Sequence, residues 1–261
     1  MTTTPCKIRI RGLYKAFNSQ TVLAGVDLDI PKGSNLVLLG GSGAGKTVLA
    51  KCLLGLIEPD AGSIQIDGRE TSRLSSRDRE ALWRKTGVLF QNGALFDSLP
   101  IWRNITFALI HDRRMDEATA RDIAIKALAE VGLGAETADL MPAELSGGMQ
   151  KRVALARAIV GEPEIVVLDS PTDGLDPIVT THIDALIVRA LKRLNATALT
   201  ITHDIASARR IGDRVAFLSG GRIAWEGPME EVDRTDHPEL LAFLGRAPGA
   251  AVLERLAAGR A

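Results

Sequence analysis

The order of apolar and polar residues along the chain predicts short strands that alternate with amphipathic helices. Runs that are continuously apolar, or that alternate with polar residues, are typical of strands. In this chain they lie at residues 7–13, 25–30, 35–39, 63–66, 87–90, 165–168, 198–202, 214–218 and 222–225. The helical patterns between these runs favour an α/β fold.

Three of the predicted helices have readable ends. In residues 46–56, apolar side chains recur at the helical period and share one face: Val48, Leu49, Cys52, Leu53 and Leu56. A second helix begins after Asp176, whose side chain suits the N-cap and whose next residue is proline, and it runs to about residue 194. A third covers residues 116–131 and is closed by Gly132.

The stretch from residue 92 to about residue 145 carries no convincing buried strand and is predicted to be helical. We therefore expect a helical subdomain, residues 92–158, that is inserted into a single α/β domain spanning residues 1–236. Residues 237–261 are rich in alanine, and we expect a C-terminal helix followed by a loose tail.

Composition narrows the classes of function. Basic and acidic residues number 32 each, so no global field attracts nucleic acid or anionic lipid, and no nucleic-acid partner is expected. No window holds the roughly 18 uninterrupted apolar residues of a spanning helix. A role at a membrane would therefore need another chain to hold this one there. With two cysteines, the chain fits a reducing compartment, and Cys52 is expected in the core.

The first candidate for chemistry is a glycine-rich loop that follows an apolar strand and opens an amphipathic helix. It matches the phosphate-binding pattern G-x-x-x-x-G-K-[ST] in full. Its residues are Gly40, Gly41, Ser42, Gly43, Ala44, Gly45, Lys46 and Thr47. Glycines let successive amides point at phosphate oxygens, and the helix start adds its positive dipole end. The alternative is a glycine-rich turn without a ligand; the pattern alone indicates a purine nucleotide with Mg²⁺, bound by Lys46 and Thr47, and not a particular machine.

A second glycine-rich helix start occurs about a hundred residues later, in the run LSGGMQKR at residues 145–152. By itself it fits an ordinary capped helix as well as an anion site. The run resembles the LSGGQ signature of ATP-binding-cassette (ABC) ATPases. The resemblance implies that Ser146, Gly147 and Gly148 face the γ-phosphate of ATP held by an opposite subunit, and hence a head-to-tail dimer of cassettes.

Further motifs of that family follow in the family's order. The run IVVLD ending at Asp169 resembles the Walker B strand, which implies that Asp169 holds Mg²⁺. Gln91 resembles the Q-loop glutamine, which contacts the metal, and Asp176 lies in a run similar to the D-loop, which crosses the dimer interface. His203 matches the switch histidine that contacts the γ-phosphate; alone, it would be read as a structural strand-end residue.

The resemblance covers roughly residues 7–232 and implies a P-loop NTPase of the ABC type. Such a fold has a RecA-like core, an antiparallel β subdomain and an inserted helical subdomain. It also implies that Phe17, which precedes the phosphate-binding loop, stacks on adenine. A phenylalanine supplies the aromatic face for such stacking. Tyr14 is the fallback, and a plain core role for Phe17 is the alternative.

One position departs from the family pattern. Ser170 stands where the family has a glutamate after the Walker B aspartate. A serine hydroxyl does not take up a proton at neutral pH as a carboxylate does. Three interpretations remain: slow hydrolysis with Ser170 and His203 orienting water, replacement of the glutamate by a nearby carboxylate such as Asp173, or ATP binding with scarcely any turnover.

Local strings resemble one branch of the family more closely. They are LFQNGALFDSL at residues 89–99, LSGGMQKRVALARA at 145–158 and THDIASAR at 202–209. They are similar to ATPases of Mce-associated lipid transporters, the Mla and toluene-tolerance branch. This resemblance implies phospholipid transport between bacterial membranes, with a permease, an Mce-type lipid-binding protein and a small STAS-domain subunit as partners. It also places the chain at the cytoplasmic face of the inner membrane, held by the permease.

Other functions remain open on the sequence alone. One is an ABC transport ATPase for another solute, and another is a non-transport cassette protein that acts on ribosomes or DNA. A third is a low-turnover clamp that pairs with an active cassette. The apolar run Ala94-Leu95-Phe96 is expected either to help dock a permease helix or to pack within the helical subdomain.

Overall fold

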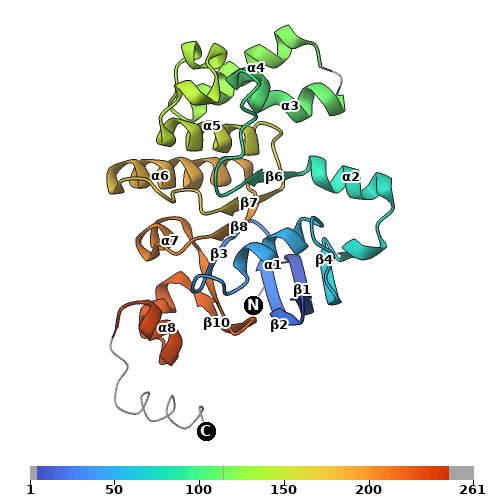
Figure 1. Ribbon diagram of the computed structural model, residues 1–261, viewed down its shortest axis with the longest axis vertical. Coiled ribbons are helices and arrows are strands. Elements are labelled where there is room, and N and C mark those ends of the chain that lie inside the picture. The colour runs from blue at the N-terminus through green and yellow to red at the C-terminus, as the bar shows by residue number, and fades with distance from the viewer. Residues whose placement is uncertain (1–4, 114, 247–261) are drawn as a thin grey trace. The chain divides into compact units, whose positions relative to one another are not determined.

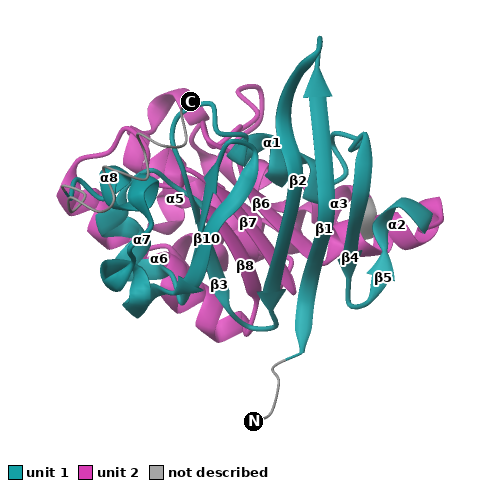
Figure 2. Cartoon of the chain, turned by 90° about the horizontal axis from the view of Figure 1, so that it is seen from below, with its two compact units in different colours: residues 1–73, 201–261 teal, residues 74–200 magenta. Residues whose placement is uncertain are grey.

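The computed structural model describes residues 5–113 and 115–246, and it divides the chain into two compact units. The first unit consists of residues 1–73 and 201–261, and the second of residues 74–200 (Figure 2). The tail predicted after the C-terminal helix lies largely outside the described residues.

The first unit contains an antiparallel sheet of four strands in the order β2-β1-β4-β5. Its long strands β1 (Cys6–Phe17), β2 (Gln20–Pro31) and β4 (Ala61–Ile66) lie side by side (Figure 2). All three contain predicted strands, although β1 and β2 extend well beyond the predicted bounds. The two-residue strand β5 (Arg69–Glu70) was not predicted, because so short a pair has no periodicity to detect.

The same unit contains a second set of strands, in the order β10-β9-β3. Strand β3 (Asn35–Leu39) is buried at every position and pairs in parallel with β9 (Arg214–Ser219), as expected of a run without alternation. Strand β10 (Arg222–Pro228) is antiparallel to β9. Among the described residues of the unit, the helices are α1 (Lys46–Leu53), α7 (Ile205–Ile211) and α8 (Pro238–Phe243) (Figure 1). The described residues also form two short 3-10 turns, η1 (Thr71–Arg73) and η4 (Met229–Arg234).

Helix α1 is shorter than the apolar pattern predicts. Leu49, Cys52 and Leu53 are buried as expected. Leu56 is 47% exposed, and its predicted place on the buried face is wrong. The helix ends at Leu53, and Gly55 adopts a φ of 65°, which turns the chain before the last apolar residue of the pattern.

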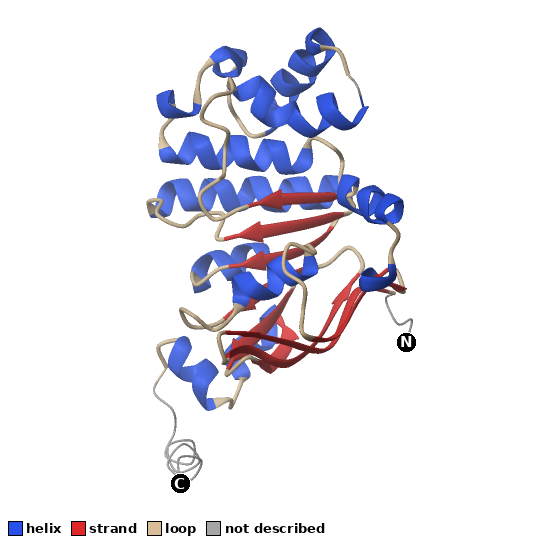
Figure 3. Cartoon of the chain, turned by 45° about the vertical axis from the view of Figure 1, so that its right-hand side comes forward, coloured by secondary structure: helices blue, strands red, loops and turns tan. Residues whose placement is uncertain are grey.

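The second unit holds the strands β6 (Thr86–Leu89), β7 (Ile165–Asp169) and β8 (Thr197–Ile201), in the order β8-β7-β6. Between β6 and β7 the described residues form helices, turns and loops, and no strand (Figure 3). The helices of the unit are α2 (Ser76–Arg84), α3 (Ile101–Arg113), α4 (Glu117–Glu130), α5 (Gly147–Ile159) and α6 (Pro177–Leu194), with short turns η2 (Ala135–Asp139) and η3 (Pro142–Glu144).

The predicted cap at Asp176 and the predicted end of α4 at Gly132 are confirmed. Asp176 accepts hydrogen bonds from the amides of Ile178 and Val179 at the start of α6. Asp116 does the same for Thr119 in α4, and Gly132 closes that helix with a φ of 71°. These caps satisfy amides that have no partner within the helix, so they fix where each helix begins.

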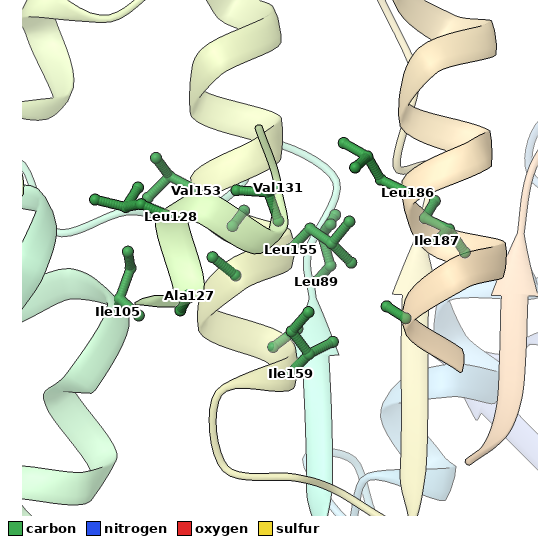
Figure 4. Packing of buried hydrophobic residues seen from close by; sticks show 14 of the residues in the cluster. Leu89, Ile105, Ala127, Leu128, Val131, Val153, Leu155, Ile159, Leu186 and Ile187 are labelled. Carbon is green, nitrogen blue, oxygen red and sulfur yellow. The ribbon is translucent and has the colours of Figure 1, made fainter. Parts of the chain in front are cut away.

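The core of the second unit lies around α5 (Figure 4). Leu155 and Ile159 of α5 pack with Leu89 of β6 and with Leu186 and Ile187 of α6. Residues of α3 and α4, including Ile105, Ala127 and Leu128, belong to the same cluster. Because α5 packs into this core from Val153 to Ile159, the helix gives rigid support to the loops that follow β6 and β7.

Candidate functional site

The predicted phosphate-binding loop joins β3 to α1 in the first unit. A Cβ added at Gly40 would lie 2.5 Å from the carbonyl oxygen of Leu218. Gly45 has a φ of 102° and lies so close to β2 that an added Cβ would be 3.0 Å from the carbonyl oxygen of Val22. Both ends of the loop therefore require glycine, which allows the backbone to curl tightly between its neighbours.

The middle of the loop is accessible and carries a cation. Gly41, Ser42 and Gly43 are exposed. The Lys46 Nζ donates hydrogen bonds to the carbonyl oxygens of Gly40 and Gly41, at 2.8 Å each. The ammonium group is thus held at the mouth of the loop, where it can reach an anion bound by the loop amides.

Helix α1 begins at Lys46, directly after the loop. Its first amides have no partner within the helix, and they point toward the loop. Thr47 is the second residue of the helix and is partly exposed. Loop, lysine and helix start together suit a triphosphate, and a hydroxyl at Thr47 suits Mg²⁺. The Mg²⁺ ion, when bound, neutralises charge on the terminal phosphates.

His203 belongs to the same unit and is exposed. The amide of Thr202 donates to the carbonyl oxygen of Leu38, at 3.5 Å, and Leu38 lies in β3 just before the loop. The Thr202 hydroxyl then accepts from the amide of Asp204, which caps α7. These contacts place His203 beside the carboxyl end of β3, the end from which the phosphate-binding loop departs.

Phe17 ends β1 and is 41% exposed, so it is not a core residue. The ammonium of Lys15 lies 5.3 Å from the centre of its ring, a cation–π geometry. Tyr14 is exposed to a similar degree, but its hydroxyl is already hydrogen bonded to Thr21, at 2.8 Å. Of the two aromatic residues, Phe17 is the more exposed, and the Lys15 ammonium lies near its ring.

In the second unit, Asp169 is the last residue of β7 and Ser170 follows it directly. Asp169 is buried at the end of the strand, and the Ser170 hydroxyl donates to its carboxylate, at 3.2 Å. Ser170 has a φ of 52°, which is costly for a residue with a side chain, typically by about 1 kcal/mol or more. The surrounding contacts must therefore hold this residue in place.

Gln91 lies in the turn after β6, and it meets the loop after β7. Its side-chain amide donates to the Asp173 carboxylate, at 3.4 Å. The amide of Asp173 in turn donates to the carbonyl oxygen of Ser170, at 3.2 Å. The structure thus brings Gln91 together with Ser170 and Asp173, which lie about 80 residues later in another motif.

Lys151 is a residue of this site that the sequence analysis did not single out. It lies on α5, is 8% exposed, and donates hydrogen bonds to the carbonyl oxygens of Gln91 and Ser170. Burial lowers the pKa of its ammonium, while the carboxylates of Asp173 and Asp169 act in the opposite direction. The sequence feature that could have identified Lys151 is a lysine at a position where the helical period predicts a buried residue.

The second glycine-rich helix start is also accessible. Ser146 caps α5 by accepting a hydrogen bond from the amide of Met149, at 3.4 Å. Ser146 and Gly147 are exposed, whereas Gly148 packs close to Val179 of α6. The capping interpretation of this run is therefore confirmed, and the exposed tip leaves room for an anion. Asp176 is exposed in the turn before α6.

The loop after Gln91 is held by its own side-chain contacts. Asn104 is fully buried; its side chain accepts from the amide of Phe96, at 2.7 Å, and donates to the carbonyl oxygen of Leu99, at 2.8 Å. Arg157 of α5 donates to the carbonyl oxygens of Gly93 and Ala94, at 2.5 and 2.8 Å. These contacts fix the loop without any partner chain.

The residues of the apolar run in this loop differ in their surroundings. Leu95 packs against the core of the unit, as the packing alternative predicts. Phe96 is 42% exposed, and its ring lies 4.7 Å from that of Phe107, which is itself 4.4 Å from the ring of His111. An exposed aromatic surface therefore lies in the loop that follows Gln91 and on the adjoining helix α3. Among the residues described, no helix has the length and apolar content needed to cross a membrane.

Comparison with known families identifies the family of the chain. Residues 23–173, more than half of the chain, match the ABC transporter family. The chain belongs to the ABC transporter family, as an ATP-binding subunit. Its mixed α/β architecture is that of the P-loop ABC ATPases.

Individual relatives of this ABC ATPase cover most of its length. It is 40% identical over 243 residues to the probable ribonucleotide transport ATP-binding protein mkl of Mycobacterium leprae. This match covers 93% of this chain and 70% of the relative. It is 34% identical to the intermembrane phospholipid transport system ATP-binding protein MlaF of Haemophilus influenzae, over 91% of this chain and 89% of the relative.

A solved structure with the same fold is the ATP-binding cassette MJ0796, in a dimeric post-hydrolysis state bound to ADP and Pi. The TM-score is 0.78 at 30% sequence identity, and the match covers 85% of this ABC ATPase and 98% of the cassette. The similarity of fold thus includes a protein captured with the products of ATP hydrolysis.

Proposed function

We propose that this ABC ATPase drives phospholipid transport between bacterial membranes. The observation that carries the proposal is the similarity to the MlaF protein of Haemophilus influenzae, which extends over nearly the whole of both chains. It agrees with the lipid-transporter strings around Gln91 and Ser146. We propose a permease, an Mce-type lipid-binding protein and a STAS-domain subunit as partners, and a position at the cytoplasmic face of the inner membrane through the permease.

A specific observation favours a second candidate. The mkl relative of Mycobacterium leprae is more similar in sequence, at 40% identity, and its name assigns it to ribonucleotide transport. An ABC ATPase for another solute is therefore the alternative. Both candidates use the same ATP chemistry, and they differ in the permease and in the molecule transported.

Purification of the intact membrane complex through a tag on this chain separates the candidates. We expect a permease of several spanning helices to co-purify, together with an Mce-type protein and bound phospholipid, which mass spectrometry would identify. A complex that carries ribonucleotide and no lipid would favour the alternative. Recovery of ribosomes or nucleic acid instead would contradict both.

For the ATP site, the proposed roles follow the motifs. Residues 40–47 bind the phosphates, Phe17 stacks on adenine, and His203 contacts the γ-phosphate. Thr47, Asp169 and Gln91 are proposed as the residues that hold Mg²⁺. The exposed loop and the ammonium of Lys46 support the role of residues 40–47, and the position of His203 beside the end of β3 supports its proposed contact.

We further propose that Ser146, Gly147, Gly148 and Asp176 contact ATP held by a second cassette, most simply a second copy of this chain. Replacing Gly147 with aspartate tests this. An added Cβ would meet only Leu175, at 3.9 Å, and an acidic residue in the first turn of α5 favours the helix. We therefore expect unchanged thermal stability but at least about tenfold weaker nucleotide-dependent dimerisation, because the carboxylate repels the γ-phosphate.

Sedimentation velocity with and without Mg²⁺ and ATPγS measures this effect. The matched control is Gly161→Asp. Gly161 lies beyond the C-terminal end of α5, away from the helix start at Ser146, and a Cβ added there meets nothing within 4 Å. The control is expected to dimerise like the wild type. Dimerisation of the Gly147→Asp protein at wild-type affinity would rule out a phosphate contact at this helix start.

The role of Ser170 is tested by steady-state ATP hydrolysis. We expect Ser170→Glu to raise turnover about tenfold or more, because a carboxylate in this place can act as a general base. Slow wild-type turnover that is lost in His203→Ala would support water orientation by Ser170 and His203. Loss in Asp173→Asn, with retention in Ser170→Ala, would assign the carboxylate role to Asp173. An unchanged rate in Ser170→Glu would show that this position does not limit hydrolysis.

A further inference from the structure

Lys151 connects two loops that come from different strands. Its ammonium donates to the carbonyl oxygen of Gln91, in the turn after β6, and to that of Ser170, in the loop after β7, at 3.3 Å for the latter. The side chain itself comes from α5, one turn after the exposed helix start at Ser146. Three segments that are distant in the sequence thus meet at one nitrogen atom.

The same two loops touch directly through Asp173. Its carboxylate accepts from the side chain of Gln91, and its amide donates to the carbonyl oxygen of Ser170. At 3.4 Å, the side-chain contact with Gln91 is long and weak. The buried ammonium of Lys151 makes the additional link, because it donates a charge-assisted hydrogen bond to each of the two loops from a single nitrogen atom.

Packing alone does not account for a lysine at this place. A methionine of similar length would fill the same space without the cost of removing an ammonium group from water. The charge is offset only because two carbonyl oxygens and the nearby carboxylates of Asp169 and Asp173 face it. The contribution of the ammonium must therefore lie in what it holds.

We propose that Lys151 is a positioning residue for ATP hydrolysis, which fixes the backbone of Gln91 against that of Ser170. This role rests on the ATPase function proposed above. Gln91 and Ser170 are both proposed to act next to the terminal phosphate, and small errors in the placement of such groups are costly. Because one ammonium binds the carbonyl oxygens of both residues, the side chains of Gln91 and Ser170 keep a constant separation.

Helix α5 offers an internal comparison. Arg157 also binds backbone carbonyls of the loop after Gln91, but only those of Gly93 and Ala94. Arg152 binds the carbonyl oxygen of Gly132, at 2.9 Å, far along the chain from either catalytic loop. Among these three basic residues of α5, Lys151 alone contacts Ser170, so Arg152 is the suitable control.

The test compares Lys151→Met, Lys151→Arg and Arg152→Met in the full-length protein. We expect Lys151→Met to lower kcat for ATP by about 10- to 100-fold, with KM for ATP within about threefold of the wild-type value, as is typical for loss of a group that orients others. Lys151→Arg should restore part of the rate because it returns a cationic donor. Arg152→Met should keep the wild-type kcat.

Amide hydrogen exchange in the nucleotide-free protein gives a second measurement. The amide of Gly93 donates to Phe90, and that of Asp173 donates to Ser170. If Lys151 holds both loops, these amides exchange faster in Lys151→Met, while the amides in the middle of α5 keep their protection. Should Lys151→Met fail to fold, Lys151→Gln, which keeps a neutral donor, is measured in the same way.

Wild-type kcat in Lys151→Met or Lys151→Gln would overturn the proposal, as would an equal loss in Arg152→Met. Unchanged exchange in residues 90–95 and 170–174 would also overturn it. A wild-type protein that binds and hydrolyses no ATP would instead contradict the proposed function, and the exchange measurement would still test the link between the loops.

Discussion

Replacing Lys46 with alanine is expected to lower ATP turnover by about 100- to 1,000-fold, the loss that follows removal of one strong donor from a preorganised anion site. Its ammonium is bonded to the carbonyl oxygens of Gly40 and Gly41. The charge therefore lies at the phosphate-binding loop. Without it, the loop keeps its amides but has no cation to neutralise charge on the terminal phosphates.

Steady-state hydrolysis and equilibrium binding of a fluorescent ATP analogue check this prediction. The control is Lys51→Ala, which removes an exposed lysine from the last turn of the same helix. It is expected to bind and hydrolyse ATP like the wild type. A Lys46→Ala protein with near-normal turnover would mean that residues 40–47 do not form the catalytic phosphate site.

The largest effect on stability is expected from Gly87→Ala. An added Cβ in β6 would lie 2.0 Å from the carbonyl oxygen of Ala158 in α5, and 3.0 Å from Pro163. The nearest atom belongs to a helix backbone, so the strand and α5 must separate before the methyl group fits. We expect a loss of about 3 kcal/mol in the free energy of unfolding, the upper range for overpacking.

Chemical denaturation of the nucleotide-free protein measures this loss. Gly161→Ala is the matched control: it is the same substitution at a glycine with open space around the added methyl group. That variant should stay within about 0.5 kcal/mol of the wild type. If Gly87→Ala is as stable as the control, then β6 and α5 are not in the close contact described above.

Much of the site could be predicted because its motifs combine a local pattern with a fixed neighbour in the chain. The loop at residues 40–47 was readable from glycine spacing and the flanking strand and helix. The caps at Ser146 and Asp176 were readable because a cap is a local hydrogen bond between a side chain and an amide shortly after it in the chain.

Features without a local pattern were missed or misplaced. Helix α2 (Ser76–Arg84) buries none of its residues, so it has no apolar stripe to detect. The end of α1 was misplaced because the apolar period continues to Leu56 after Gly55 has turned the chain. Lys151 and Asn104 were missed as well, since their partners lie on other segments and only the tertiary fold brings them together.

The hydrogen bonds of Asn104 and Arg157 bear on how a permease would attach. A helix that docks on Phe96 meets a backbone that is ordered in advance, so attachment avoids an ordering cost of about 1–2 kcal/mol per residue. The heat-capacity change on assembly should then follow the apolar area buried, without a contribution from coupled folding. Because this surface is rigid, a movement of the cassette would be passed to the permease with little loss of amplitude.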